Sequence, residues 1–141
     1  MSTTIKIEGL KKLKAKLNGK SLAVEIARGV VDATNFLHQK IVLDIQRGSR
    51  TGRIYKRKNR KHQASAPFEP PKTDTGTLIR GIKPRITRSG MTGEVLSTAR
   101  YAKDLEYGTR RMKPRPYLRS NLRRYKREIV AKIERRVKAF I

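Results

Sequence analysis

The tripeptide Asp74–Gly76 has the sequence Asp-Thr-Gly, which carries the catalytic carboxylate in aspartic proteases. In those enzymes two such carboxylates share a proton, and each follows an apolar strand. A homodimer could supply the second carboxylate, but residues 70–73 are Pro-Pro-Lys-Thr, so no apolar strand precedes Asp74. The setting instead favours a cap, in which Asp74 or Thr75 accepts hydrogen bonds from the free N–H groups of a short helix that begins at Thr77.

The sequence lacks the other common catalytic and metal-binding patterns. It has no cysteine, which excludes thiolate chemistry and cysteine-ligated zinc. Its two histidines, His38 and His62, have no matching carboxylate cluster that would complete a metal site. It has neither a phosphate-binding Gly-x-x-x-x-Gly-Lys loop nor a Gly-x-Ser-x-Gly nucleophile turn. These observations predict a protein that needs no cofactor and no metal and is not an enzyme.

The net charge is the most unusual property of the chain. Its 36 lysines and arginines against 11 acidic residues give +25, a field that attracts polyanions and opposes compact folding. The simplest alternative is that these cations only solvate the surface. The densest run contains Tyr55 as its only aromatic residue, so it offers charge for phosphate contacts but little for base recognition. The candidate inter-subunit or DNA-contact residues in this run are Arg53, Lys56, Arg57, Lys58, Arg60 and Lys61.

The length of 141 residues predicts one domain, residues 1–141, with a long basic loop at about residues 47–75. Loops longer than about 12–15 residues are uncommon in compact domains and are usually functional or disordered. No apolar run approaches the roughly 20 residues that a membrane crossing needs. The N-terminal segment also lacks the apolar core of a signal peptide. We therefore expect assembly in the cytoplasm and no membrane partner.

Two long amphipathic helices are expected. Ile5 and Ile7 alternate with polar residues and indicate a first strand, and leucines at helical spacing follow it. The first long helix follows, from about residue 22 to Gly48, and the second begins at Arg115-Pro116. The apolar stripe of the first is Leu22, Ile26, Val30, Ala33, Leu37, Ile41 and Ile45. The stripe of the second is Leu118, Leu122, Tyr125, Ile129, Ile133, Val137 and Phe140.

The segment between the long helices predicts a small antiparallel sheet. Residues 82–88 and 94–99 indicate two strands joined by a hairpin, and Pro84 places the first of them at a sheet edge. Short helices are expected at residues 77–82 and 100–106, the latter ending at Gly108. The predicted fold class is α+β, with two long amphipathic helices packed on a small antiparallel β-sheet and a long basic loop.

Five segments in this order resemble a known family. They are "IKIEGLKKL", "RTGRIYKR", "HQASAPFEPPKTDTGTL", "YAKDLEYGT" and "RPYLRSNLRR". Together they resemble the neck and tail-component proteins of long-tailed double-stranded DNA phages, the family named after gene product ten of the Hong Kong coliphage. The motif positions are Thr75, Gly76, Leu78, Tyr101, Ala102, Glu106, Gly108, Thr109, Arg115, Pro116 and Leu118. The resemblance spans residues 5 to about 133, although the basic run after Tyr55 is heavier than is usual in the family.

The resemblance implies a structural virion protein without catalytic activity. Identical subunits would form a closed ring at the head–tail joint, as a neck or tail-completion protein that connects the capsid connector to the tail. Its expected partners are neighbouring neck, connector, tail-terminator or tail-tube proteins, and double-stranded DNA that passes through without sequence recognition. The alternative is a free, sequence-nonspecific basic nucleic-acid-binding protein. That class commonly adds stacking aromatics or a glycine clamp, but this chain is 6% aromatic and has no such clamp.

Overall fold

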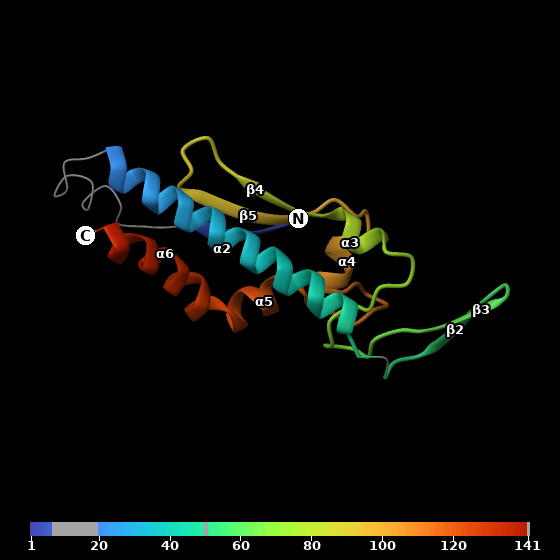
Figure 1. The fold of residues 1–141 in the computed structure, drawn as a ribbon. Helices are drawn as coiled ribbons and strands as arrows, with labels where there is room; N and C mark the ends of the chain where they lie inside the picture. The colour runs from blue at the N-terminus through green and yellow to red at the C-terminus, as the bar shows by residue number, and fades with distance from the viewer. Residues whose placement is uncertain (7–19, 50, 141) are drawn as a thin grey trace.

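The computed structural model of the chain describes residues 1–6, 20–49 and 51–140. Ile7 and the leucine repeat at residues 10–17 lie outside the described residues. The elements form an α+β fold with two long helices, α2 and α6, on a small antiparallel sheet, which confirms the predicted class (Figure 1). They are β1 (Ser2–Lys6), α2 (Lys20–Arg47), β2 (Ile54–Arg57), β3 (Arg60–Gln63), α3 (Thr77–Gly81), β4 (Ile82–Ile86), β5 (Thr92–Ser97), α4 (Ala102–Tyr107), α5 (Leu118–Arg124) and α6 (Lys126–Phe140).

The helix α2 confirms the first predicted amphipathic helix. It runs for 28 residues and ends at Arg47, immediately before Gly48. Every residue of the predicted stripe, from Leu22 to Ile45, is buried. Gly29 lies in the middle of this helix, where a Cβ atom would be 3.0 Å from the Cα atom of Ile133 on α6. The glycine thus permits the close approach of the two long helices, which offsets its unfavourable helix propensity.

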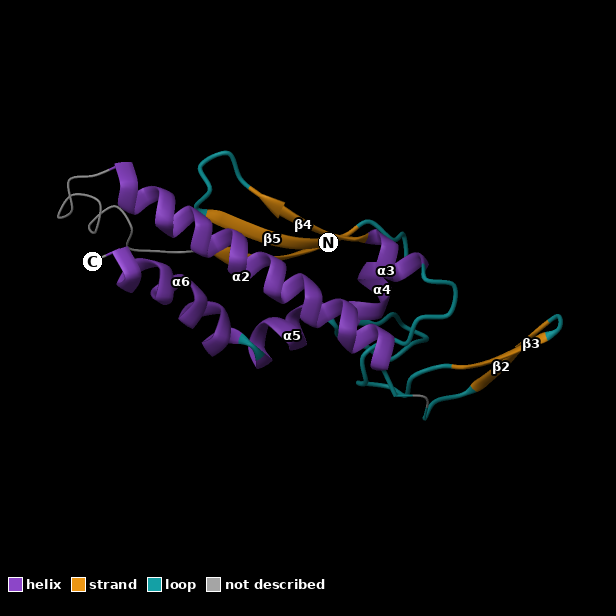
Figure 2. Cartoon of the chain, in the orientation of Figure 1, coloured by secondary structure: helices purple, strands orange, loops and turns teal. Residues whose placement is uncertain are grey.

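The sheet has the strand order β1-β5-β4, and both pairings are antiparallel. The central strand β5 contacts α2 closely at Gly93, because a Cβ atom there would lie 1.8 Å from Oγ1 of Thr34. β4 is an edge strand and contains Pro84 opposite Val95, as the sequence predicted. α2 contacts both β4 and β5 on one side and α6 on the other, so it forms the middle of the molecule (Figure 2).

The prediction of one continuous C-terminal helix was wrong. The chain forms α5 and then α6, and Tyr125 between them has φ −101° and ψ 14°. Backbone hydrogen bonds still run from Tyr125 to Asn121 and from Ile129 to Tyr125, so the break is a local change of direction. The ring of Tyr125 contacts Phe36 edge-on at 5.7 Å between centroids. No proline or glycine marks this position, so apolar periodicity could not reveal it.

The expected basic loop contains a β-hairpin, which the sequence did not predict. β2 and β3 pair in antiparallel register, with Lys56 opposite Lys61 and Arg57 opposite Arg60. The turn includes Lys58 with a positive φ of 44°. Every residue of β2 is exposed, so no buried face imposes the alternation of polar and apolar residues by which strands are recognised. The hairpin extends away from the helices and the larger sheet (Figure 1).

Candidate binding site at the base of the basic hairpin

The hairpin presents two faces of different composition. Directly paired residues of antiparallel strands project to the same side, and successive residues alternate between sides. One face, here called the near face, therefore carries Tyr55, Arg57, Arg60 and His62. The opposite, or far, face carries Ile54, Lys56, Lys61 and Gln63. The near face includes the residues that line a cleft at the base of the hairpin, whereas the far face does not.

The charge arrangement does not favour an isolated hairpin. Like charges directly opposite each other destabilise strand pairing, and two such pairs, Lys56 with Lys61 and Arg57 with Arg60, follow each other here. A two-stranded hairpin is at best marginally stable in water even without this repulsion. All six candidate contact residues predicted from the sequence are exposed. A partner that supplies negative charge would therefore stabilise the hairpin as well as bind it.

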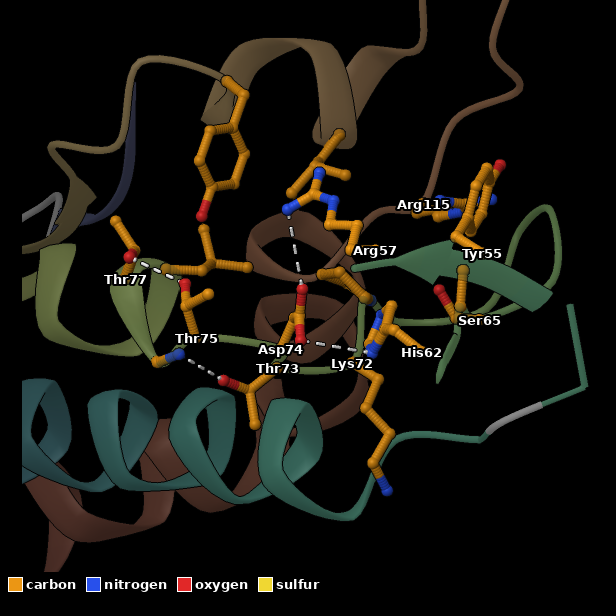
Figure 3. Close-up of a pocket in the computed structure, with 16 residues that line it drawn as sticks. Tyr55, Arg57, His62, Ser65, Lys72, Thr73, Asp74, Thr75, Thr77 and Arg115 are labelled. Atoms are coloured by element: carbon orange, nitrogen blue, oxygen red, sulfur yellow. Dashed lines mark hydrogen bonds and ion pairs between the residues drawn. The ribbon is translucent and has the colours of Figure 1, made fainter. Parts of the chain in front are cut away.

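Asp74 lies beside the hairpin instead of capping a helix. Its carboxylate lies 3.9 Å from Nη1 of Arg57 and 3.5 Å from Nδ1 of His62 (Figure 3). The prediction that Asp74 or Thr75 caps the short helix was wrong, because the cap residue of α3 is Gly76, with φ 76° and no side-chain hydrogen bond. The amide of Gly76 donates to Oγ1 of Thr73 at 3.1 Å, which orders the turn without either predicted residue. The left-handed φ explains the requirement for glycine at this position.

Glu106 joins two of the segments that carry the family resemblance. Its side chain is fully buried at the end of α4 and accepts hydrogen bonds from the backbone amides at the start of α5. The amides of Tyr117, Leu118 and Arg119 donate to it at 2.8, 3.0 and 2.9 Å. These are N–H groups that a helix start leaves without intrahelical partners, and a carboxylate there also favours the helix dipole. The Arg119 side chain adds an ion pair at 3.4 Å.

The connection from α4 to α5 depends on glycine and on backbone contacts. Gly108 has φ 76°, and a Cβ atom there would lie 2.7 Å from the carbonyl oxygen of Met112. Thr109 forms an isolated antiparallel bridge with Met112. The amide of Arg115 donates to the carbonyl of Leu105 at 2.6 Å, which brings the chain back to α4. A tight reversal therefore places residues 115–118 against Glu106.

The segment that leads from the hairpin to Asp74 is fixed by Glu69. The carboxylate of Glu69 accepts hydrogen bonds from the backbone amide of Ala66 at 3.0 Å and from Oγ1 of Thr51 at 2.8 Å. These bonds, chiefly the one from Ala66, hold the pKa of Glu69 below its ordinary value. Phe68 in this turn has a positive φ of 66°, is 66% exposed, and donates its amide to the carbonyl of Pro114. The turn thus holds a large apolar side chain in solvent next to the α4–α5 connection.

The structure places the predicted residues in three groups. Five motif residues line the cleft together with Arg57, and these are Thr75, Gly76, Leu78, Tyr101 and Arg115. The others lie in or beside the α4–α5 connection, and these are Ala102, Glu106, Gly108, Thr109, Pro116 and Leu118. The remaining candidate cations lie on the hairpin or its approach outside the cleft, and these are Arg53, Lys56, Lys58, Arg60 and Lys61. Sequence reasoning missed Tyr55, His62 and Lys72 as cleft residues, because the pairing of β2 with β3 brings the first two there and the path of residues 71–78 brings Lys72.

The burial of Tyr117 predicts an effect of pH on stability. Tyr117 is fully buried, and this burial raises the pKa of its phenol to about 12. In the unfolded chain a tyrosine ionises at about pH 10. The free energy of unfolding should therefore fall as the pH rises from about 10 to about 12, because only the unfolded state releases the proton there. Urea unfolding of the wild type and of Tyr117→Phe at about pH 9 and about pH 11 isolates this contribution, because the free energy of unfolding of the wild type should fall relative to that of the variant. An unchanged pH dependence in Tyr117→Phe would contradict the assignment.

Among the residues that the structure describes, no three histidine, aspartate or glutamate side chains gather as a metal site would require. The helices in the described ranges are all too short or too polar to cross a membrane. Comparisons with protein-family models, with curated proteins and with solved structures gave no match for this chain.

Proposed function

We propose that this chain is a non-enzymatic virion protein that forms a closed ring at the head–tail joint of a long-tailed phage. In this role it would connect the capsid connector to the tail and surround the path of the DNA. The observation that carries the proposal is the exposed hairpin, which places two like-charged pairs in succession, one on each face, with no fully buried residue in either strand. Such an element gains stability when another surface supplies negative charge and covers it, as in an assembly.

The linked motif residues also support this role. Glu106 joins the segment that contains Tyr101 and Ala102 to the segment that contains Pro116 and Leu118. Two of the five segments that resemble the neck and tail-component family are therefore parts of one contact network. A cyclic ring repeats one heterologous contact until it closes, so a single subunit carries two different contact surfaces. The hairpin on one side of the molecule can serve as one of them.

Assembly is the property that tests the proposal. We expect the purified chain to form a closed ring of defined mass at high protein concentration in the absence of nucleic acid, alone or with its neighbouring neck proteins. Native mass spectrometry and analytical ultracentrifugation would measure this mass. A compact monomer at every concentration, even with the partner proteins present, would contradict the ring and favour the free nucleic-acid-binding protein.

The role of the six candidate cations distinguishes the ring protein from a free nucleic-acid-binding protein. Replacement of all six by glutamine should reduce the number of tailed particles more than it reduces DNA affinity, because we assign these residues mainly to an acidic neighbouring ring. DNA binding should be independent of sequence, and the logarithm of the affinity should fall with the logarithm of salt concentration by about 0.9 per neutralised phosphate. Counting tailed particles and measuring DNA affinity at two salt concentrations would give both quantities.

A matched variant controls for net charge. Six other exposed cations without an ion pair in the described structure can be replaced by glutamine, and these are Lys103, Arg110, Arg111, Lys113, Arg123 and Lys126. This variant should leave tailing closer to normal, because it removes the same charge from other surfaces. Normal tailing together with abolished DNA binding in the hairpin variant would show that the hairpin is a nucleic-acid arm.

A further inference from the structure

The cleft at the base of the hairpin has an excess of hydrogen-bond donors. It has a volume of about 430 Å³ and is lined by the near face of the hairpin, by residues 71–78, and by side chains from α4 and its connection to α5. Among the described residues that line it, Arg57, Lys72 and Arg115 contribute positive charge and Asp74 alone is acidic. These three cations against one carboxylate give this lining a net positive charge.

The donors in the cleft are incompletely used. Asp74 lies 3.9 Å from Arg57 and 3.5 Å from His62, distances beyond the usual 2.7–3.2 Å of a hydrogen bond. The Nε atom of Arg115 is buried and has no hydrogen-bond partner among the described residues. This atom is covered by the protein, so a ligand in the cleft would instead meet the guanidinium of Arg57, which is 79% exposed and lies too far from Asp74 for a close hydrogen bond. Figure 3 shows Arg57 and His62 directed at Asp74 from the hairpin side.

The walls of the cleft set the character of the ligand. Leu78, Leu105 and Pro71 provide apolar surface, and Thr75 and Thr77 add hydroxyl groups. Tyr55 and Tyr101 are about half exposed among the lining residues. A ligand that fits these walls carries an oxyanion beside an apolar group. Pockets with mostly apolar walls and a few convergent polar groups are typical of specific binding sites.

We infer that this cleft binds the carboxylate side chain of an acidic segment from a different protein. Arginine binds a carboxylate strongly through its planar set of donors, and the apolar wall would accommodate neighbouring side chains of the segment. Lys56 and Lys61 lie outside the cleft on the far face of the hairpin, so they take no part in this site.

A second copy of this chain fits the cleft less well. Most acidic side chains that the structure describes already accept ion pairs or hydrogen bonds within the subunit, among them Glu25, Asp32, Asp44, Glu69, Glu94 and Glu106. The inference extends the proposed function by naming the chemistry of one partner. It does not depend on the ring, because the cleft is formed within one subunit.

The test uses the full chain and a short blocked peptide with one glutamate between leucines, and a second peptide with glutamine in place of the glutamate. We expect the glutamate peptide to cause saturable changes in the amide NMR signals of Asp74, Thr75 and Gly76. The glutamine peptide should cause none at the same concentration. Arg57→Gln should weaken the binding by about tenfold, the loss expected for one charge-assisted hydrogen bond. The matched control Lys56→Gln removes the same charge from the far face and should leave the affinity within about twofold.

Several outcomes would overturn the inference. Equal weakening by Arg57→Gln and Lys56→Gln would show that the peptide responds only to overall charge. Binding of the glutamine peptide with the same affinity would show that no carboxylate site exists. Signals of Asp74–Gly76 that shift with duplex DNA, and do so less in Arg57→Gln, would assign the cleft to phosphate. The Arg57 side chain is 79% exposed, so its replacement should not unfold the protein. If the peptide does not bind, the proposed ring is still tested separately by the mass of the assembly.

Discussion

Replacement of Glu106 by alanine is expected to lower the free energy of unfolding by about 3–5 kcal/mol, since it leaves several buried donors without an acceptor. The carboxylate accepts hydrogen bonds from three consecutive backbone amides, of Tyr117, Leu118 and Arg119. Tyr117 and Leu118 are themselves fully buried, so water cannot easily replace the lost acceptor at their amides. Urea unfolding, followed by circular dichroism, would measure the loss.

Two further variants make the Glu106 measurement specific. Glu106→Gln retains a single carbonyl oxygen but introduces an NH₂ group that cannot accept, so it should cost about half as much as Glu106→Ala. Glu134→Ala removes an acidic residue from an exposed position on α6 and should change stability by no more than about 0.5 kcal/mol. A loss below about 1 kcal/mol in Glu106→Ala would show that the start of α5 finds other acceptors.

The role of Glu106 also shows where sequence reasoning reaches its limit. The sequence placed Glu106 among the motif residues by resemblance alone, without a physical reason. The reason is that the Glu106 carboxylate binds backbone amides eleven to thirteen positions later in the chain. Almost every residue type has a backbone amide, so the amino-acid sequence does not reveal such a contact. The tight reversal at Gly108 that makes this contact possible is equally invisible to hydrophobic periodicity.

Elements with one buried face could be predicted, whereas exposed elements could not. The stripe from Leu22 to Ile45 predicted α2 because one face of that helix is buried throughout. Pro84 predicted an edge strand because proline lacks the donor that a central strand needs. The hairpin β2–β3 has no fully buried residue in either strand and is held by backbone pairing, so its amino-acid composition is typical of a loop. The cleft was missed for the same reason, because it exists only once the hairpin is formed.

The packing of α6 against α2 gives the second large effect. Ile129 is 3% exposed and belongs to the same apolar cluster as Leu37 and Ile41 of α2. Ile129→Ala should therefore lower the free energy of unfolding by about 2–5 kcal/mol, through lost burial and the cavity that remains. The sequence predicted this burial from the stripe shared by Leu122, Ile129 and Ile133, although Leu122 and Ile133 are only partly buried.

The neighbouring residue provides the control for Ile129. Val130 is 45% exposed on the same turn of α6, so Val130→Ala should change the free energy of unfolding by no more than about 0.5 kcal/mol. A comparable loss in both variants would indicate a general effect on helix α6 instead of a packing contact. A loss below about 1 kcal/mol for Ile129→Ala would mean that α6 can leave α2 without unfolding the rest, as an exchangeable arm would. The close contact between Gly29 and Ile133 argues against such an arm, because two helix backbones that approach to van der Waals distance bury the side chains on both sides of the contact.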